Sequence, residues 1–387
     1  MACSNGERLA ARQVVTELRA LGRRGVRTQT HWVRPVGALV AAVLAIAGVA
    51  ASVLSVDHPR LGLGIATGAL LLLIGDLSGR LPLLRRITVA RATQNVVSSG
   101  GRPDAPVRLV ITASLDTPRG GILDGGGRLA RTVARLRRAL RGHLPGRYGL
   151  LFLALAATAA CAGARAAGTD DRWLGAVQLL PALALLALAG LMTDAVTARA
   201  GHPGAGANAS AVAVALALMS ALDRRPPRAL AVDLVVAGAG EAGALGMRRW
   251  VAEQRRAGTG AEDVAVLHIG PCGQGRPAWW TRDGLVLATR YHPQFLRAAQ
   301  RVAAGEAHMG ARPHQSRRTS GARAARAAGW PALAIGCLDD AGTVPRSGSD
   351  TDTVEAVDPD AVAAALALAL GIVAALDSEL AQARSAP

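Results

Sequence analysis

Few residues in this chain have the type and spacing that nucleophilic catalysis requires. Ser114 lacks the Gly-x-Ser-x-Gly turn that exposes a nucleophilic serine, and no His–Asp pair is specified near it. Cys272 follows a short apolar run, but a catalytic cysteine needs a histidine partner and a lowered pKa. His268 belongs to that same run and is expected to point along the strand, away from the turn. We therefore expect Cys272 to be a small buried thiol.

Two further patterns that often mark a site do not specify one here. The four cysteines form no CxxC pair and no disulfide framework, which favours a reducing compartment: Cys3, Cys161, Cys272 and Cys337. The glycine-rich segment Gly120–Gly127 lies between a strand and a helix, where a phosphate loop would lie. It has neither the Walker lysine nor the GxGxxG spacing, so we interpret it as a hinge.

The elements that would position a site alternate between strand and helix. Short β-branched runs predict four strands: Val107–Thr112, Leu230–Ala237, Val264–Ile269 and Ala332–Ile335. Helical patterns cover three segments: Ala209–Leu222, a stretch ending at Trp250, and Pro359–Ala383. This alternation predicts an α/β sandwich around a mostly parallel sheet.

The composition points to a basic and apolar protein. The 44 basic residues exceed the 27 acidic ones, which gives a net charge of +17, and every basic residue is arginine. Hydrophobic residues make up 51% of the chain, which excludes an intrinsically disordered protein. Charged residues make up only 18%, below the roughly 25% of an ordinary soluble protein. A membrane protein with arginine-rich loops and a nucleic-acid binder remain as candidates.

Four apolar runs have the length of membrane spans: Val36–Val56, Leu61–Leu77, Tyr148–Ala164 and Leu174–Thr193. A bilayer core needs about 20 apolar residues, so the runs predict two transmembrane hairpins, at 35–80 and 148–197. Trp32, Tyr148 and Trp173 lie at run ends, where amphipathic rings prefer the interface. The alternative is a set of buried core helices. Two shorter apolar runs, Ala209–Leu222 and Val362–Leu376, are better interpreted as buried helices of a globular domain.

The arginines predict the orientation of these spans. They are dense in the N-terminal helix or arm, 1–34, and between the hairpins, but sparse at the hairpin tips. Because positive loops stay inside, we expect four spans with the N-terminus and the C-terminus in the cytoplasm. The first thirty residues hold no apolar run, so no signal peptide is expected.

The segment 128–147 predicts a basic amphipathic helix just before the second hairpin. Its apolar residues fall on one helical face: Leu129, Val133, Leu136 and Leu140. Arginines that include Arg131, Arg135 and Arg138 fill the other faces and are expected to contact the anionic inner leaflet. Nucleic-acid binding is the alternative, but no recognition motif accompanies these arginines, so a nucleic-acid partner is not expected.

Several segments form an ordered series along the chain: Thr93–Val97, Ile111–Thr117, Pro203–Ser210, Val236–Gly246, Ser320 with Gly329–Ala332, and Ser349–Val354 with Asp358. This series resembles the co-catalytic zinc exopeptidases of metallopeptidase clan MH, the aminopeptidase and carboxypeptidase type. The resemblance covers about Arg8–Gly22 and Val89 to the end of the chain, and the two hairpins interrupt it. It implies a three-layer α/β domain with a mostly parallel mixed sheet. Its first strands would lie in 81–127 and its main part in 198–387.

The resemblance also implies where a metal site would lie, and most of its positions have lost their ligands. The family's five ligands fall at Ser114, Ala207, Glu241, Gly270 and Ser347, the last of which is replaced by Arg346 if one residue is gapped. Only Glu241 keeps a ligand side chain, and the general-base position is Gly240. Asp116 and Asp350 are retained at positions that contact the ligands and not the metal in the family.

This pattern predicts a membrane-bound pseudopeptidase with no zinc. Such a domain would act in binding or scaffolding, with a peptide, a protein or a lipid headgroup in the old cleft. The alternative is an active membrane metallopeptidase or amidohydrolase that holds zinc in a rebuilt site of His202, Glu241 and His268. A third candidate is a membrane-tethered nucleic-acid binder.

Overall fold

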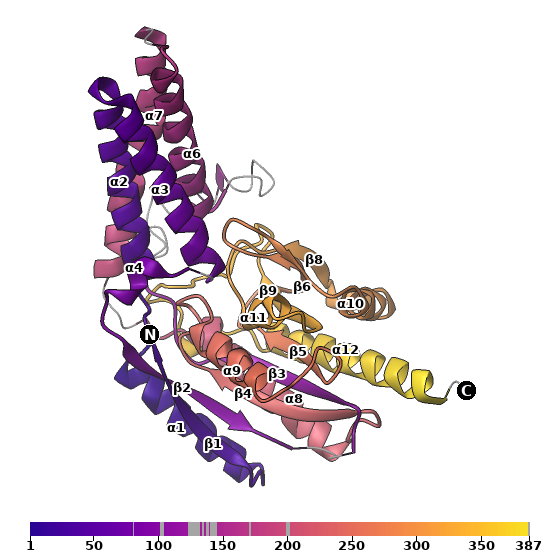
Figure 1. The fold of residues 1–387 in the computed structure, drawn as a ribbon. Helices are drawn as coiled ribbons and strands as arrows, with labels where there is room; N and C mark the ends of the chain where they lie inside the picture. Colours follow the sequence, from indigo (N-terminus) through magenta and orange to yellow (C-terminus); the bar gives the residue numbers. More distant parts are fainter. Residues whose placement is uncertain are drawn as a thin grey trace.

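A computed structural model describes residues 1–79, 81–100, 104–122, 132–133, 135–136, 139, 145–169, 172–198 and 202–385. The described chain forms an α/β domain and a column of four long helices that rises from one end of it (Figure 1). The domain is built from a single sheet with helices packed against it.

The sheet contains nine strands: β1 (Val26–Val33), β2 (Arg91–Ser98), β3 (Val107–Ser114), β4 (Leu230–Ala237), β5 (Val264–Ile269), β6 (Arg276–Asp283), β7 (Thr289–Arg290), β8 (Arg312–Gln315) and β9 (Ala332–Leu338). The strand order is β1-β2-β4-β3-β5-β9-β6-β7, and β8 pairs with β6. The central strands β4, β3, β5 and β9 are parallel to one another. Antiparallel pairs flank them on both sides, so the sheet is mixed, as predicted.

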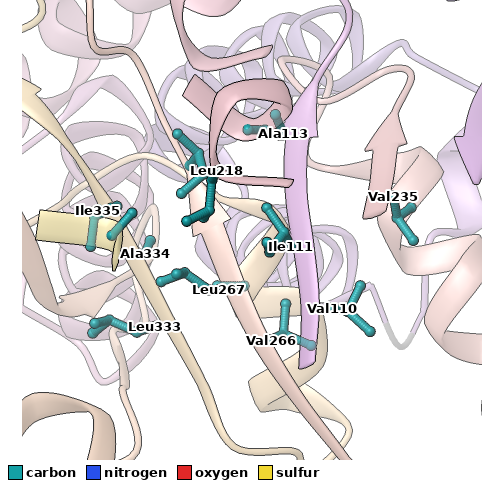
Figure 2. Packing of buried hydrophobic residues seen from close by; sticks show 14 of the residues in the cluster. Val110, Ile111, Ala113, Leu218, Val235, Val266, Leu267, Leu333, Ala334 and Ile335 are labelled. Carbon is teal, nitrogen blue, oxygen red and sulfur yellow. The ribbon is translucent and has the colours of Figure 1, made fainter. Parts of the chain in front are cut away.

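The central strands form because they are near-continuous apolar runs. A strand that is buried on both faces has no polar side to alternate with, and parallel strands are of this kind. Val110 and Ile111 of β3 and Val266 and Leu267 of β5 are all fully buried (Figure 2). Leu218 of a covering helix lies in the same cluster. This core is the rigid base from which the loops at the strand ends project.

Helices pack against the sheet and complete a three-layer α/β fold. One group consists of α8 (Ser210–Arg224), α10 (Pro293–Gly305) and α12 (Pro359–Ser385), in which α12 contacts both α8 and α10. The other group consists of α9 (Leu245–Arg256) and α11 (Gly321–Ala327). Both groups contact the strands, so the predicted fold class of the domain is confirmed.

The first 34 residues are part of the sheet domain and not a separate arm. Helix α1 (Asn5–Ala20) packs on β1 and β2, and its residues Val14 and Leu18 are buried in the core of the domain. Strand β1 pairs along its whole length with β2. The sequence of β1, VRTQTHWV, is mostly polar, as suits a strand at the edge of a sheet. Because it is not an apolar run, the sequence did not predict a strand here.

The column contains α2 (Gly37–Asp57), α3 (Pro59–Ser78), α6 (Arg147–Ala166) and α7 (Arg172–Thr197). It has a core of its own, which includes Leu44, Leu73, Leu155 and Leu185. Within the described residues, six helical segments are long and apolar enough to cross a membrane, and four of them are these helices. The other two, 205–224 and 359–383, pack against the sheet, as the sequence predicted for the shorter apolar runs.

Close contacts fix the helices of the column against one another. Gly62 of α3 lies so near α2 that a Cβ atom on it would be 2.5 Å from Ser55 Cβ and 2.7 Å from the Ala51 carbonyl oxygen. At the same end of α2, the Gln178 amide donates to the hydroxyls of Ser52 and Ser55, at 3.0 and 2.8 Å. The hairpins are therefore packed as one bundle, with a polar crosslink between α2 and α7.

Candidate functional site

The site predicted from the resemblance lies at the carboxyl ends of the parallel strands. Ser114 ends β3, Ala237 ends β4, and Gly270 follows β5. Loops at these ends are where open α/β sheets bind ligands. The bundle stands directly beside this end, because the Arg119 guanidinium donates to the Val196 carbonyl and the Ile122 N–H donates to Asp194, at 3.0 and 2.8 Å.

Asp116 organises the centre of the site. Its two carboxylate oxygens accept the N–H groups of Gly240 and Glu241, at 2.5 and 3.1 Å, and its carbonyl oxygen accepts the Asn208 amide at 2.5 Å. Asp116 is fully buried. This burial, with the carboxylates of Glu241 and Glu7, raises the pKa of Asp116 to about 8. Asp116 thus holds the turn after β4 through hydrogen bonds.

The general-base position has no room for a side chain. A Cβ atom on Gly240 would lie 2.2 Å from Ser114 Oγ, 2.6 Å from Ser114 Cβ and 3.1 Å from Asp116 Oδ1. Ser114 is the last residue of β3, so its Cβ atom cannot move away without moving the strand. The space in which a base and a metal-bound water would meet is therefore filled by Ser114.

Glu241, the retained ligand position, already has partners of its own. One of its oxygens accepts the Asn208 amide at 3.0 Å, and the other accepts the Arg318 guanidinium at 3.2 Å. The side chain of Arg318 is 53% exposed and that of Glu241 26%, so the pair lies at the mouth of the site. A guanidinium supplies the positive charge that a metal ion would otherwise supply to this carboxylate.

The loop before α8 carries Ala207, one of the five positions at which the resemblance implies a ligand. Residues Ala205–Ala209 form a π-helical turn, and the Asp352 carboxylate accepts the N–H groups of Gly206 and Ala207, at 2.7 and 3.3 Å. Ala207 is buried and its methyl group offers no donor to a metal. Asn208, one residue later, points its amide to Asp116 and Glu241. The turn is thus held by the Asp352 carboxylate, which accepts from its backbone, and by the side-chain amide of Asn208.

The remaining ligand positions, Gly270 and Ser347, also have no carboxylate or imidazole that could bind a metal. The Gly270 N–H donates to the Ile335 carbonyl at 2.8 Å, which pairs it with β9. Ser347 is half-buried in the loop before Asp350, and the neighbouring Arg346 has a φ of 55°. An open pocket of about 560 Å³ lies here, lined by Arg346, Asp350, Thr351, Thr353, Glu355 and Ala356.

The structure does not assemble the rebuilt site of His202, Glu241 and His268. His202 Nδ1 lies 2.8 Å from the Asp350 carboxylate, while Glu241 is paired with Arg318. His268 is buried beside Gly321, and this burial lowers its pKa to about 4. In the residues the structure describes, no three His, Cys, Asp or Glu side chains group as metal ligands. The described residues therefore do not support the rebuilt site, which stays a prediction.

The side chains present do not fit a pair of zinc ions. Zinc in proteins is bound by His nitrogen, Cys sulfur or carboxylate oxygen, and a two-metal site needs several of them. Of the five positions, four hold Ser, Ala, Gly and Ser.

The expected burial of the Cys272 thiol is confirmed. Cys272 is fully buried and its Sγ donates to the Gly270 carbonyl. A hydrogen bond with Cys337 and burial raise the pKa of Cys272 well above its usual value, which makes it unreactive.

Three residues of the site were not predicted, although two of them, Asn208 and Asp352, lie in segments that match the family's order. Arg318 comes from the loop before α11, 77 positions after Glu241, and no pattern connects the two. Asn208 and Asp352 act through backbone and amide contacts that only the folded loops bring together.

The arginines predicted for the membrane surface lie in a different part of the chain, before the second helical hairpin. The helix at 128–147, with Arg131 and Arg138, lies largely outside the described residues, whereas Arg135 is helical and exposed.

Comparisons with known proteins agree with this fold. Residues 193–373, less than half of the chain, match the model of peptidase family M28. A zinc aminopeptidase from Bacillus subtilis aligns at a TM-score of 0.53 and 11% identity, covering 96% of this chain and 89% of that one. A glutaminyl cyclase from Porphyromonas gingivalis aligns at 0.52 and 13% identity, covering 98% and 92%.

Two further comparisons add no argument about this protein. LapB from Legionella pneumophila aligns at a TM-score of 0.49 and 10% identity, and although 96% of this chain is covered, it spans only 64% of that protein. No curated protein matches the sequence. At these identities the solved structures establish the fold alone. The α/β part of the chain is therefore a zinc-exopeptidase-like domain that resembles peptidase family M28.

Proposed function

We propose that this protein is an integral membrane protein whose M28-like domain binds a ligand without hydrolysing it. One observation carries the loss of hydrolysis: Ser114 occupies the space beside Gly240 in which a general base would stand. Metal-assisted hydrolysis needs an activated water and a group that takes its proton. With Gly240 at the base position, the described site provides neither group.

The four helices of the bundle support the membrane assignment. Each is 20 to 26 residues long, close to the length that crosses the hydrocarbon core, about 20 residues. Large apolar side chains on their outer faces are exposed, which suits lipid and not water: among them are Ile46, Val53, Leu71, Leu180 and Leu186. The arginine-rich segments then favour four spans with both termini in the cytoplasm.

The cleft that remains offers paired charges to a ligand. Glu241 and Arg318 present one anion and one cation at its mouth. His202 and Asp350 lie beside the open pocket that Arg346 lines. Such an arrangement suits a peptide or a chain terminus, which carries charge of both signs. A scaffolding role follows if that peptide belongs to another membrane protein.

Metal analysis tests the proposal most directly. Full-length protein purified in detergent is expected to contain less than stoichiometric zinc and to leave a panel of aminoacyl and dipeptide substrates intact. Glu241→Ala should change neither result. Stoichiometric zinc that Glu241→Ala removes, together with peptidase activity, would overturn the proposal in favour of an active enzyme. Glu262→Ala is the matched control, since Glu262 is an exposed glutamate next to the start of β5, at the opposite end of the strand from Gly270.

The membrane topology needs a separate measurement. A reporter fused to the C-terminus is expected to be active only in its cytoplasmic form. Activity of a reporter that works only outside the cytoplasm would overturn the orientation but leave the binding role standing.

A further inference from the structure

Large exposed apolar side chains of the α/β domain concentrate near the bundle. We call six of them the apolar rim: Trp32 (65% exposed), Leu81 (58%), Leu83 (44%), Ile87 (85%), Val89 (79%) and Leu287 (62%). Single exposed apolar residues are ordinary on a protein surface, but a contiguous group marks an interaction surface. The rim is unlike the rest of the domain, where the described exposed residues of this kind are scattered, as Leu9, Leu21 and Val354 are.

The rim residues come from three segments that meet at the foot of the bundle. Leu81 to Val89 connect the end of α3 to β2 and include the short helix α4 (Leu83–Arg86), which lies at the base of the column (Figure 1). Trp32 pairs with Ala92 at the end of β1, five residues before α2. The Arg34 guanidinium donates to the Thr88 carbonyl at 2.9 Å, which ties these two segments together.

The third segment is the loop between β6 and β7, which carries Leu287. A Cβ atom on Gly149, near the start of α6, would be 3.9 Å from the Leu285 carbonyl oxygen, so this loop touches the foot of the second hairpin. The rim therefore contacts both hairpins at the same end of the bundle.

The segment that carries four of the six rim residues, Leu81, Leu83, Ile87 and Val89, has charges of one sign. Between Gly79 and Gly100 the chain carries four arginines and no acidic residue. The nearest acid along the chain, Asp76, is already bound by both Nε and Nη2 of Arg85, at 2.5 and 2.7 Å. Arg86 and Arg91 are exposed beside the apolar side chains. A surface that mixes large apolar groups with cations matches an anionic lipid interface.

We infer that the apolar rim inserts into the headgroup region of the bilayer and docks the α/β domain against the membrane surface. This inference rests on the proposed membrane-spanning bundle. The rim lies at the foot of that bundle, next to its lipid-facing side. Helix α2, at 1.5 Å per residue, is about 32 Å long, close to the hydrocarbon thickness. Trp32 then lies at one interface and the exposed Trp173, at the start of α7, at the other, where tryptophan is enriched.

Depth-dependent quenching tests the inference on the full-length protein. Ile87→Cys and Leu21→Cys are each labelled with an environment-sensitive fluorophore in a Cys3→Ser background, where the other three cysteines are buried. The proteins are placed, one copy per disc, in nanodiscs of phosphatidylcholine and phosphatidylglycerol with brominated acyl chains. The matched control is Leu21, an exposed leucine at the end of α1 that lies away from the bundle.

The label at position 87 is expected to be strongly quenched and blue-shifted, at a depth of about 5–10 Å, and the label at 21 to be unquenched. Val89→Cys should reproduce the result if Ile87→Cys disturbs folding. Equal, weak quenching at 87, 89 and 21 would overturn the inference. Extraction of the unlabelled protein from membranes by alkaline carbonate would instead overturn the spans, so the two failures are distinguishable.

Discussion

The Glu241 carboxylate and the Arg318 guanidinium form an ion pair of 3.2 Å at the mouth of a zinc-exopeptidase-like site. In a metal site this carboxylate would be bound to a cation from the solvent. Here the chain supplies the cation itself, from a loop 77 residues further along. The exchange removes the need for metal at this position and leaves a polar pair facing the solvent.

Replacing Arg318 should cost little stability. Exposed ion pairs contribute about 0–1 kcal/mol, so Arg318→Ala is expected to lower the free energy of unfolding by less than about 1 kcal/mol, and Arg318→Lys by less still. Added zinc should not restore Arg318→Ala, because one carboxylate does not hold the ion. Urea unfolding with and without zinc measures both. A large stabilisation of Arg318→Ala by zinc would show that the pair conceals a working metal site.

The contact between Ser114 and Gly240 predicts a strongly coupled pair. Gly240→Ala places a methyl group 2.2 Å from Ser114 Oγ and should destabilise the domain by about 1–3 kcal/mol, as overpacking does. Ser114→Gly removes both contacting atoms and should relieve most of that cost in the double variant. A double-mutant cycle of unfolding free energies measures the coupling. Additive effects of the two changes would contradict a steric clash between residue 240 and Ser114.

The buried carboxyl of Asp116 predicts a dependence of stability on pH. Its pKa is raised from 3.8 in the unfolded chain to about 8 in the fold, so the folded state keeps a proton that the unfolded state releases. Its stabilising contribution is complete below pH 4 and is lost as the pH rises towards 8. The side chain of Asp116→Asn cannot titrate, so the stability of this variant does not fall with pH for this reason.

The difference in unfolding free energy between wild type and Asp116→Asn should therefore move in favour of the variant between pH 4 and 8, and then level off. Denaturation at intervals of one pH unit measures it. A constant difference over this range would show that the Asp116 carboxyl keeps its usual pKa.

The close approach of α2 and α3 predicts opposite outcomes for two nearby glycines. Gly62→Ala brings its methyl group to 2.7 Å from the Ala51 carbonyl, so it should separate the two helices and lower the melting temperature in detergent. Gly64→Ala meets no atom within 4 Å and should be neutral or stabilising by up to about 1 kcal/mol, since alanine favours helix. Thermal unfolding followed by size-exclusion chromatography compares the two. Equal losses in both variants would contradict the packing.

The strands that the sequence predicted best are those whose local pattern and final environment agree. Leu230–Ala237 and Val264–Ile269 are continuous apolar runs, and the structure places β4 and β5 over the same residues. Strand β6 was missed because Pro277 and two charged ends interrupt its run, and only pairing with β9 makes it a strand. Ser114, Gly240 and Glu241 could be placed together through the family resemblance. Arg318 could not, because its partner is fixed by the tertiary fold and not by spacing.

The antiparallel pairing of β1 with β2 gives the helical hairpin of α2 and α3 a simple topological meaning. Val33 lies opposite Arg91, and everything between them leaves the sheet and returns to the same place. Helices α2 and α3 are thus the enlarged loop of an ordinary β-hairpin. A two-residue turn could close the same ladder without altering any strand of the sheet. This pair of helices is therefore an insertion carried on a loop, outside the strands of the sheet.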